Sequence, residues 1–581
     1  MAGVPHRLND ERPAVPRIVL PVTARGLALT DRVCWVILGV GMAVAAGLIL
    51  YLNRGTTFSP DQTFFFLDTS SLGASDVFES RTGHLVITTR LAYLAILETV
   101  GAEYVAFRLI AVATLLLCAG FFYALAKRRI GALPALAPTL VLLFLGSAWQ
   151  HVVVPNGFTV MLSVSAGLAA LLALERVDSR GNIVACALLT LSVASYSTGL
   201  AFLVGVAISV LLRPDRRRRA WIFLVPLVLY AAWWLWETPS QAYGGEGPAP
   251  SNVFLVVNFT GEAFATVAAA LTGLGYDFGG TSDPFAGPAP PALELGWGRI
   301  LAALAVIALV VRIRRGHLAP SLWTSLGILV TFWALAALVT GVGTRAPTAI
   351  RYIFPGSVAV LLVATDAARA SRFSRFGLAA LFIAALLSVA TNVALLRDGA
   401  AWFRDVQSGR IGAQFAMLEL ARDRVNPGFD PVGIVPELVS VRAAEYFATI
   451  DRYGSPAPSV AELERQNEDI RESADQILAR ALALRLEASS SRPDGGCRQL
   501  NAVQTEAPLG LELPRGGASL RVQAPGPAAV TLGRFGELPS VEFGSLSPRQ
   551  TATLRIPPDA SPRPWRAGVA GASSVEVCEL R

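Results

Sequence analysis

The sequence is poor in charged residues, and this sets the first limit on the class of protein. Only 16% of its 581 residues are Asp, Glu, Lys or Arg, whereas 53% are hydrophobic and the mean hydropathy is +0.52. Soluble domains carry about 25% charged residues. The composition therefore excludes an ordinary soluble protein and predicts an integral membrane protein.

Lysine is almost absent: Lys127 is the only lysine among 49 basic residues. A net charge of +7 would suggest a nucleic-acid partner in a soluble protein. Here, however, the arginines gather in short connections between apolar segments, a pattern that marks the cytoplasmic side of membrane proteins. We therefore expect a lipid bilayer, and no nucleic acid, as the partner of this charge.

The sequence also lacks the common soluble-enzyme motifs and has few cysteines. No CxxC, HExxH, Walker or GxGxxG pattern occurs in a fitting context, so nothing indicates a soluble zinc or nucleotide-binding enzyme. Cys34, Cys118 and Cys186 lie in apolar segments, where we expect small buried side chains. Cys497 and Cys578 lie near the two ends of the last polar region. We expect a disulfide between them if this region lies outside the cytoplasm.

Eleven apolar segments are interpreted as membrane spans, which need about 20 residues each. Alternate connections between them carry the arginines, so the N-terminal tail is expected in the cytoplasm. This tail is polar, and the run after it is long enough to remain as a span, so we expect no cleavable signal peptide. Because eleven is odd, the C-terminal region is expected outside. The segments are 33–52, 104–126, 132–149, 157–175, 182–196, 198–213, 220–237, 295–312, 321–341, 352–368 and 377–396.

Two further apolar segments do not fit this pattern. Residues 84–100 contain Arg90 and Glu98, and residues 253–275 contain Asn258 and Glu262. If either segment crossed alone, every later basic connection would move to the outer side. We therefore expect both to lie on the outer face or to dip into the membrane. The alternative is that both cross, although the basic cluster at 127–129 argues against a crossing by the first.

The predicted fold class is mainly α, a polytopic bundle of about 11 spans with interfacial helices and an extracytoplasmic C-terminal α+β region. Segments such as AQFAMLELARDRV and SVAELERQNEDIRESADQILARALALRLEA have helical spacing, whereas ASLRVQA, AVTLGRF, TATLRI and SVEVCEL predict the strands of a small β-sandwich. The expected domains are a cytoplasmic tail (1–32), a transmembrane domain (33–397) with outer loops 53–103 and 238–294, a helical region (398–490) and a β-rich domain (491–581).

The outer loops contain the residues that suit chemistry. A carboxylate beside arginines at the boundary of lipid and water suits a reaction between a lipid-linked phosphate and a hydroxyl group. The acid would remove the proton, and the arginines would hold the leaving phosphate. The first outer loop supplies Asp61, Asp68, Asp76, Glu79, His84 and Arg90. Later segments supply Arg108, Gln150, His151, Asn156, Arg345, Arg351 and Tyr352.

Each candidate also has a structural explanation. Asp61 could cap the helix that follows it, and His84 could cap the next apolar segment. Arg90 could extend toward the membrane surface, while Arg345 and Arg351 could anchor the ends of spans at the lipid headgroups. The structural explanation is favoured for three other residues, namely Asp76 and Glu79 as solvated charges and Trp149 as an interfacial aromatic.

Several short stretches resemble a known superfamily. TFSPDQTFF, RTGHLV, GSAWQ, YSTGL and IRYIFP resemble a group of actinobacterial membrane proteins with the architecture of the C-type glycosyltransferase superfamily, over about residues 30–400. The resemblance implies that Asp61, in the first outer loop, is the catalytic aspartate. It also implies that Gly83-His84-Leu85 is the motif later in that loop, and that the C-terminal part is similar to carbohydrate-binding modules.

Two departures from the superfamily pattern concern a metal. The acidic doublet usual after the first span is replaced by Asp61 followed by Gln62, and no second acid is adjacent. The metal is therefore unknown, and a divalent cation stays possible.

The preferred hypothesis is an inverting sugar transferase of the cell membrane. A polyprenyl-phosphate sugar would be the donor, and an extracytoplasmic glycan, lipid or protein hydroxyl the acceptor. Asp61 would be the base, with Asp68 and His84 shaping the acceptor site, and Arg345 and Arg351 would bind the donor phosphate. Arg90, Arg108, Gln150, His151, Asn156 and Tyr352 complete the expected substrate-binding set.

Three alternatives belong to other functional classes. A flippase or transporter of lipid-linked glycans would need charges at mid-span or broken helices. A polymerase or ligase would depend on a large late loop, and a non-catalytic scaffold would tolerate substitution of the acids in the first outer loop.

Overall fold

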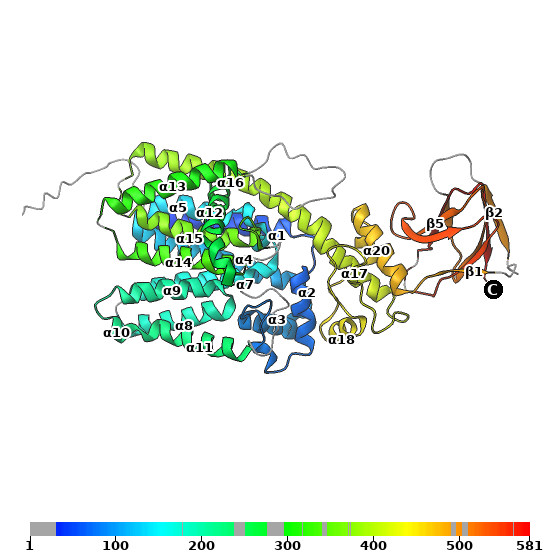
Figure 1. Cartoon of the computed structure of the whole chain (residues 1–581), viewed down its shortest axis with the longest axis horizontal. Coiled ribbons are helices and arrows are strands. Elements are labelled where there is room, and N and C mark those ends of the chain that lie inside the picture. Colours follow the sequence, from blue (N-terminus) through cyan, green and yellow to red (C-terminus); the bar gives the residue numbers. More distant parts are fainter. Residues whose placement is uncertain are drawn as a thin grey trace, which may run out of the picture.

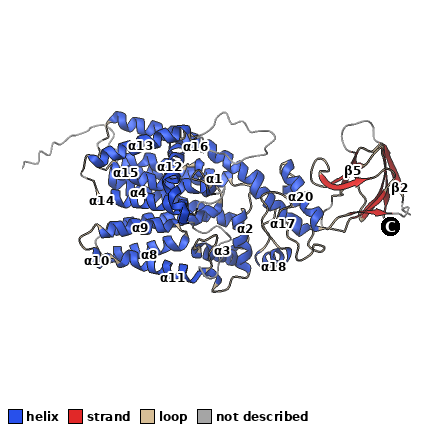
Figure 2. Cartoon of the chain, viewed as in Figure 1, coloured by secondary structure: helices blue, strands red, loops and turns tan. Residues whose placement is uncertain are grey.

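The computed structural model describes residues 31–176, 178–237, 250–275, 295–316, 318–339, 345–369, 371, 373–489, 496–501, 509–559, 561 and 563–580. A bundle of helices, a smaller helical region and a β-sandwich follow one another along the chain (Figures 1 and 2). This order confirms the predicted mainly α, polytopic fold class. Most of the predicted tail 1–32 and of the outer loop 238–294 lies outside the described residues.

The bundle is formed by apolar helices that run back and forth between two ends. Among the described residues, eight helices have the length and composition of a full span, and α5 with α6 is a ninth, bent pair. Helices α8, α9 and α11 are apolar but shorter. The chain is a multi-pass membrane protein. The helices that match the eleven predicted spans are α1 (Asp31–Leu52), α4 (Tyr104–Ile130), α5 (Ala132–Leu143), α7 (Phe158–Leu174), α8 (Ser179–Ser195), α9 (Thr198–Leu211), α11 (Trp221–Glu237), α13 (Gly296–Arg314), α14 (Pro320–Leu338), α15 (Ile353–Ala367) and α16 (Arg375–Trp402).

The arginine-rich connections gather at one end of the bundle, which we call the basic end. Lys127 at the end of α4 pairs with Asp31 at the start of α1, at 2.8 Å, and Arg128 pairs with Glu175 after α7. Further bonds join the remaining connections: Arg219 to the Arg176 carbonyl, Arg312 to the Ala367 carbonyl and Arg129 to Asp366. The expectation that this end is cytoplasmic remains a prediction.

The opposite end, which we call the loop end, contains shorter elements. They are α2 (Pro60–Ser70), η1 (Asp76–Phe78), α3 (Ile87–Val100), η2 (Gly146–Ala148), α6 (Trp149–Val152) and η3 (Pro155–Gly157). Helix α3 has 14 residues. After its last turn, the Ala102 amide donates to the Tyr453 carbonyl at 2.8 Å, and Glu98 pairs with Arg452. The C-terminal end of α3 therefore lies at the loop end, and the interfacial position of 84–100 stays a prediction.

The second irregular segment forms η4 (Pro250–Leu255) and α12 (Val256–Thr272). By length and composition 251–272 is a candidate span, which the sequence analysis did not assign. The contacts of α12, however, involve only the parts of the neighbouring helices that lie toward the loop end. Glu262 pairs with Arg299 in the first turn of α13, Phe259 packs on Tyr352 before α15, and the Ala270 carbonyl accepts from Asn392 of α16. Helix α12 thus contacts the loop-end parts of these helices, and its position on the outer face stays a prediction.

The span predicted at 132–149 is bent by 41° between α5 and the segment η2–α6. A Cβ atom at Gly146 would lie 1.7 Å from the Asn392 carbonyl oxygen, so only glycine allows this approach to α16. The amide and hydroxyl of Ser147 both donate to Asn392 Oδ1, at 3.0 and 2.8 Å. The bend turns Trp149 inward against Gly399, where it is 1% exposed. The prediction that Trp149 is an interfacial aromatic was therefore wrong.

The helical region is continuous with the last span. Helix α16 passes through η7 (Phe403–Ser408) into α17 (Gly409–Leu420), so the boundary predicted at 397/398 lies inside one long helix (Figure 1). Helices α18 (Ala443–Tyr453), α19 (Val460–Leu463) and α20 (Glu468–Ala481) follow. Helical spacing had predicted a helix through residue 488. The helix ends earlier because Ala483 adopts a φ of 49°, in the left-handed region.

The β-sandwich therefore begins at residue 486 instead of 491. Its sheets have the strand orders β1-β7-β4-β9-β2 and β3-β8-β5-β6, and all pairings are antiparallel. The four predicted runs form β4, β5, β7 and β9. A disulfide joins Cys497 to Cys578 on the paired strands β2 and β9. The strands are β1 (Leu486–Ser489), β2 (Cys497–Asn501), β3 (Leu509–Glu512), β4 (Gly517–Gln523), β5 (Ala528–Gly533), β6 (Val541–Leu546), β7 (Thr551–Arg555), β8 (Arg566–Ala570) and β9 (Ser574–Glu579).

One buried carboxylate attaches the sandwich to the helical region. Asp475 of α20 is fully buried and accepts hydrogen bonds from the backbone amides of Arg534, Phe535 and Gly536, at 2.9, 2.9 and 3.0 Å. Burial raises the pKa of Asp475, and the three amides act in the opposite direction. The turn after β5 is thus held on α20 by a charged acceptor.

We expect the substitution Asp475→Ala to loosen this attachment. It leaves three buried amides without their acceptor, which should cost about 2–3 kcal/mol locally. The measurement is hydrogen exchange of amides 534–536 by mass spectrometry, which should become faster than in the wild type. Asp469→Ala, at an exposed position on the same helix, is the matched control and should leave this exchange unchanged. Equal protection in Asp475→Ala would contradict the role of the carboxylate.

Candidate functional site

Helix α2 presents Asp61 at the loop end. Ser59 is the N-cap, and it forms a capping box with Gln62, so Asp61 does not cap the helix as the structural explanation supposed. Tyr104 of α4 donates from its hydroxyl to Gln62 Oε1 at 3.0 Å, which ties this first turn to the bundle. The Asp61 side chain remains exposed. Asp61 is therefore positioned by Ser59 and Gln62, which fix the first turn of α2.

The nearest hydrogen-bond donor to Asp61 comes from η3. Asn156 Nδ2 lies 3.5 Å from Asp61 Oδ2, which is the long limit for a hydrogen bond. Asn156 Oδ1 is buried and has no hydrogen-bond partner among the described residues. Two residues that were predicted separately, on distant loops, are thus brought together by the fold. Asp61 keeps an open side toward solvent.

The face of α2 that carries Asp61 also carries Phe64 and Asp68, because residues three and seven positions apart lie on one side of a helix. The guanidinium of Arg81 lies 3.8 Å above the centre of the Phe64 ring, and the charges of Asp68 and Asp61 act on it. Arg81 was missed in the sequence analysis, although it opens the RTGHLV stretch. The only signal was its position three residues before His84.

Arg90 also faces α2. Its Nη1 lies 3.6 Å from Asp68 Oδ2, and the side chain is only 5% exposed. The explanation that Arg90 extends to the membrane surface is therefore wrong. From this position Arg90 holds the side chain of Asp68 in place.

His84 lies at the other end of a tight turn that begins at Arg81. The two residues exchange backbone hydrogen bonds of 2.9 Å, and the residues between them, Thr82 and Gly83, both have positive φ. His84 Nδ1 is 2.8 Å from Ser197 Oγ, and its ring centre is 4.2 Å from that of Tyr196. Helix α3 begins later, after Val86, so His84 is not its cap.

Two arginines approach the site from the η6 side. Arg351 lies in η6 (Ile350–Tyr352) and is exposed, and Arg345 Nη1 donates to the Val339 carbonyl at 3.2 Å. Burial, together with the charges of these two arginines, lowers the pKa of His84 to about 4. The imidazole is consequently neutral near pH 7.

The other candidates near η6 point inward. The turn η6 packs against α6, where His151 is 7% exposed and feels the charge of Arg351. Tyr352 packs on Phe259 and Phe332. Gln150 is half-buried on the same short helix α6. These residues form the floor beneath Arg351.

Tyr196 connects the acidic and basic sides. Burial raises the pKa of its phenol to about 12, with Asp61 acting in the same direction and Arg351 in the opposite one. The charges of the carboxylate and the guanidinium thus both act on one half-buried side chain between α8 and α9. We call the cluster the loop-end site. Its members are Asp61, Arg81, His84, Asn156, Tyr196, Ser197 and Arg351.

The remaining predicted residues lie outside this cluster. Arg108 Nη2 donates to the Thr56 carbonyl at 2.7 Å and stacks on Tyr104, on the other side of the start of α2. Asp76 accepts from the Gly73 amide and the Ser75 hydroxyl, and both bonds lower its pKa. Glu79 is exposed. Asp76 and Glu79 thus fit the structural explanation that the sequence favoured.

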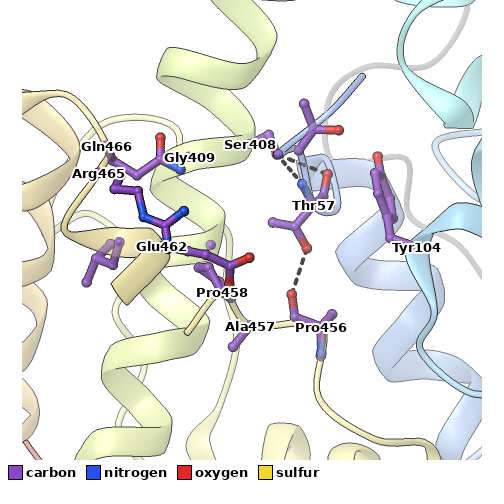
Figure 3. Close-up of a pocket in the computed structure, with 14 residues that line it drawn as sticks. Thr57, Tyr104, Ser408, Gly409, Pro456, Ala457, Pro458, Glu462, Arg465 and Gln466 are labelled. Atoms are coloured by element: carbon purple, nitrogen blue, oxygen red, sulfur yellow. Dashed lines mark hydrogen bonds between the residues drawn. The ribbon is translucent and has the colours of Figure 1, made fainter. Parts of the chain in front are cut away.

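A cavity of about 390 Å³ lies where the chain before α2 meets the helical region (Figure 3). It is bounded by the chain before α2, by Tyr104 and by the helical region, and Asp61 is not part of its wall. Its lining residues are Gly55, Thr56, Thr57, Tyr104, Ser408, Gly409, Gly412, Pro456, Ala457, Pro458, Glu462, Leu463, Arg465 and Gln466. We call it the junction cavity.

No protein-family model and no curated protein sequence matches this chain. Solved structures of similar fold include ArnT from Cupriavidus metallidurans in the apo state, at 12% identity and a TM-score of 0.46, covering 80% of this chain and 97% of that chain. The same protein bound to undecaprenyl phosphate gives 13% identity, a TM-score of 0.43, and coverage of 74% and 87%. The arabinosyltransferase EmbB from Mycobacterium smegmatis gives 14% identity, a TM-score of 0.32, and coverage of 98% and 65%.

These similarities concern the overall arrangement of the chain and not the roles of individual residues.

The lowered pKa of His84 predicts a pH-dependent stability. The unfolded chain binds a proton near pH 6.5 and the folded one only near pH 4, so the stabilisation from neutral His84 is complete above about pH 6.5 and is lost as the pH falls toward 4. Thermal unfolding in detergent at about pH 7 and about pH 5 should show a smaller difference for His84→Gln than for the wild type. An equal difference in the two proteins would contradict the neutral state of His84 in the folded protein.

Proposed function

We propose that the protein is a membrane glycosyltransferase that moves a sugar from a polyprenyl-phosphate donor to a hydroxyl group of an extracytoplasmic glycan, lipid or protein. The observation that supports this most directly is the loop-end site itself. An open carboxylate, Asp61, and an exposed guanidinium, Arg351, act on the same tyrosine at the end of the bundle opposite the basic connections. By the positive-inside rule, that end faces away from the cytoplasm.

In the proposed reaction, Asp61 is the general base. It removes the proton of the acceptor hydroxyl while the acceptor oxygen forms a bond to the anomeric carbon of the sugar. The bond from this carbon to the phosphate oxygen breaks, and the polyprenyl phosphate leaves with the electron pair. Attack on the face opposite the leaving group inverts the anomeric carbon. An exposed carboxylate whose contact with the Asn156 amide is as long as 3.5 Å is suited to accept this proton.

The arginines stabilise the leaving phosphate. Charge develops on the phosphate as the bond to the sugar breaks, and a fixed guanidinium stabilises such charge. Arg351 is exposed at the loop end, and Arg345 is held beside it by its bond to the Val339 carbonyl. We assign both to the donor phosphate. Arg108, bound to Thr56, is farther from this role than the sequence suggested.

The residues on the α2 side shape the acceptor site. Arg81 stacks on Phe64, and the charges of Asp68 and Asp61 both act on its guanidinium. Neutral His84 has one ring nitrogen with a proton and one without, so it donates one hydrogen bond and accepts another. Nδ1 of this ring is hydrogen-bonded to Ser197 Oγ. The second nitrogen is the proposed contact with the acceptor.

We expect Asp61→Asn to abolish most of the transfer. The amide is nearly isosteric with the carboxylate but cannot take the proton, so the rate should fall by about 10²- to 10⁴-fold. The assay is transfer from a radiolabelled polyprenyl-phosphate sugar to endogenous acceptors in membranes that contain the full-length protein.

The matched control is Asp76→Asn, which changes an acid of the same loop outside the cluster and should keep wild-type transfer. Full activity of Asp61→Asn at equal protein levels would remove the base assignment. It would also favour a non-catalytic scaffold.

Arg351→Ala should weaken the handling of the donor. Loss of a charged hydrogen bond to phosphate costs about 1.5–3 kcal/mol, which corresponds to about a tenfold or larger fall in kcat/KM for the donor. Arg351→Lys should recover only part of this, because the ammonium lacks the paired donors of a guanidinium. Arg54, which is exposed and stacks on Tyr51, is the control position. A donor kcat/KM unchanged in Arg351→Ala would show that the phosphate binds elsewhere.

A further inference from the structure

We propose that the junction cavity is a binding site for a neutral, hydroxyl-rich glycan segment, the part of the acceptor behind its reacting end. The role as acceptor subsite rests on the proposed function, whereas the binding itself does not. The cavity lies where the chain before α2 meets the helical region (Figure 3). Its volume of about 390 Å³ falls within the usual range of small-molecule sites.

One wall of the cavity is fixed by hydrogen bonds between segments that are distant in sequence. The Thr57 amide donates to Ser408 Oγ at 2.6 Å, and the Ser408 hydroxyl donates to the Thr57 carbonyl at 3.0 Å. The Thr57 hydroxyl donates to the Pro456 carbonyl, also at 3.0 Å. These bonds join the membrane domain to the end of α16–η7 and to the loop before α19. The wall is thus formed before any ligand arrives, which lowers the entropy cost of binding.

The other wall carries polar side chains on and just after α19. Figure 3 shows Glu462, Arg465 and Gln466 on one side of the cavity and Thr57 with Tyr104 on the other. Glu462 closes a capping box with Ser459, whose amide and hydroxyl both donate to Oε2, and this lowers the Glu462 pKa. Arg465 Nε donates to the Ala461 carbonyl. The hydrogen bonds within the described residues thus leave Glu462 Oε1 and both Nη groups of Arg465 for a ligand.

This set of groups selects the class of ligand. The guanidinium of Arg465 and the amide of Gln466 each present two polar atoms side by side, and Glu462 adds the acceptor Oε1; this set matches neighbouring hydroxyls on a sugar ring. Pro458, Leu463 and the ring of Tyr104 offer apolar surface to its C–H groups. One negative and one positive side chain balance each other, so neither a strongly anionic nor a cationic ligand is favoured. A neutral sugar chain satisfies all three conditions.

The cavity is also connected to the proposed base. Tyr104 lines the cavity and bonds through its hydroxyl to Gln62, the residue after Asp61 in the first turn of α2. The side chain of Tyr104 therefore separates a glycan held in the cavity from the first turn of α2. This position suits the body of an acceptor whose terminal hydroxyl is presented on the other side of that turn.

The test measures binding to the full-length protein in lipid nanodiscs, without donor. The probes are neutral oligosaccharides of about two to six pentose or hexose units, compared by calorimetry with the same sugars carrying a phosphate. We expect the wild type to bind at least one neutral chain better than its phosphorylated form. Ala457→Phe, which fills the cavity from its rim, and Arg465→Ala should each weaken this binding about tenfold or more.

Arg424→Ala changes an exposed arginine of the same region outside the cavity and should bind as the wild type does. Thermal unfolding curves identify any variant that fails to fold. Asp61→Asn should bind the neutral chain normally even though it loses transfer, so failure of the proposed function and failure of this proposal give different results. In the transfer assay, Ala457→Phe should lose the preference for longer over shorter acceptors.

Two outcomes would overturn the proposal. In the first, the wild type binds none of the neutral oligosaccharides, or binds the phosphorylated forms better. In the second, the folded Ala457→Phe and Arg465→Ala variants retain wild-type affinity, which would place the binding elsewhere on the chain.

Discussion

A bilayer provides no water for exposed backbone groups, and this constraint determines where irregular chain is possible. The apolar helices satisfy their own amides and carbonyls, so the turns and short helices concentrate at the ends of the bundle. The main exception within the bundle is the break after α5. There, Asn392 Oδ1 accepts hydrogen bonds from the amide and the hydroxyl of Ser147. The candidate residues share the loop end because the short elements α2, η1, α6, η3 and η6 lie there.

A charged pair is buried at the basic end of the bundle, whereas two charged residues of the loop-end site are exposed. At the basic end, Arg129 and Asp366 form a buried pair at 3.0 Å, and Ser321 and Ser325 complete the hydrogen bonds of the acid. Such a network is satisfied internally and suits a structural role. At the loop end, Asp61 and Arg351 stay exposed, and a tyrosine lies between their charges. Charges that are placed but left open to solvent suit the binding of substrate.

The sequence predicted the features that depend on local pattern. Hydropathy and arginine clusters identified the spans, and alternation identified four strands, because these signals need no contact between distant segments. Arg81 and Ser197 were missed as members of the site, since each gains its position only when η1–α3 packs against α8 and α9. Trp149 was misplaced because the bend that buries it depends on Gly146 approaching Asn392. The pairing of Asn156 with Asp61 likewise depends on tertiary packing, and only their common outer side was predictable.

The unbroken run from α16 through η7 to α17 has a mechanical meaning. It extends over 46 residues, which is about 70 Å of helix at 1.5 Å per residue. The helical region that carries the sandwich thus continues directly from the last span, so the two parts of the chain are joined by regular helix and not by a flexible linker.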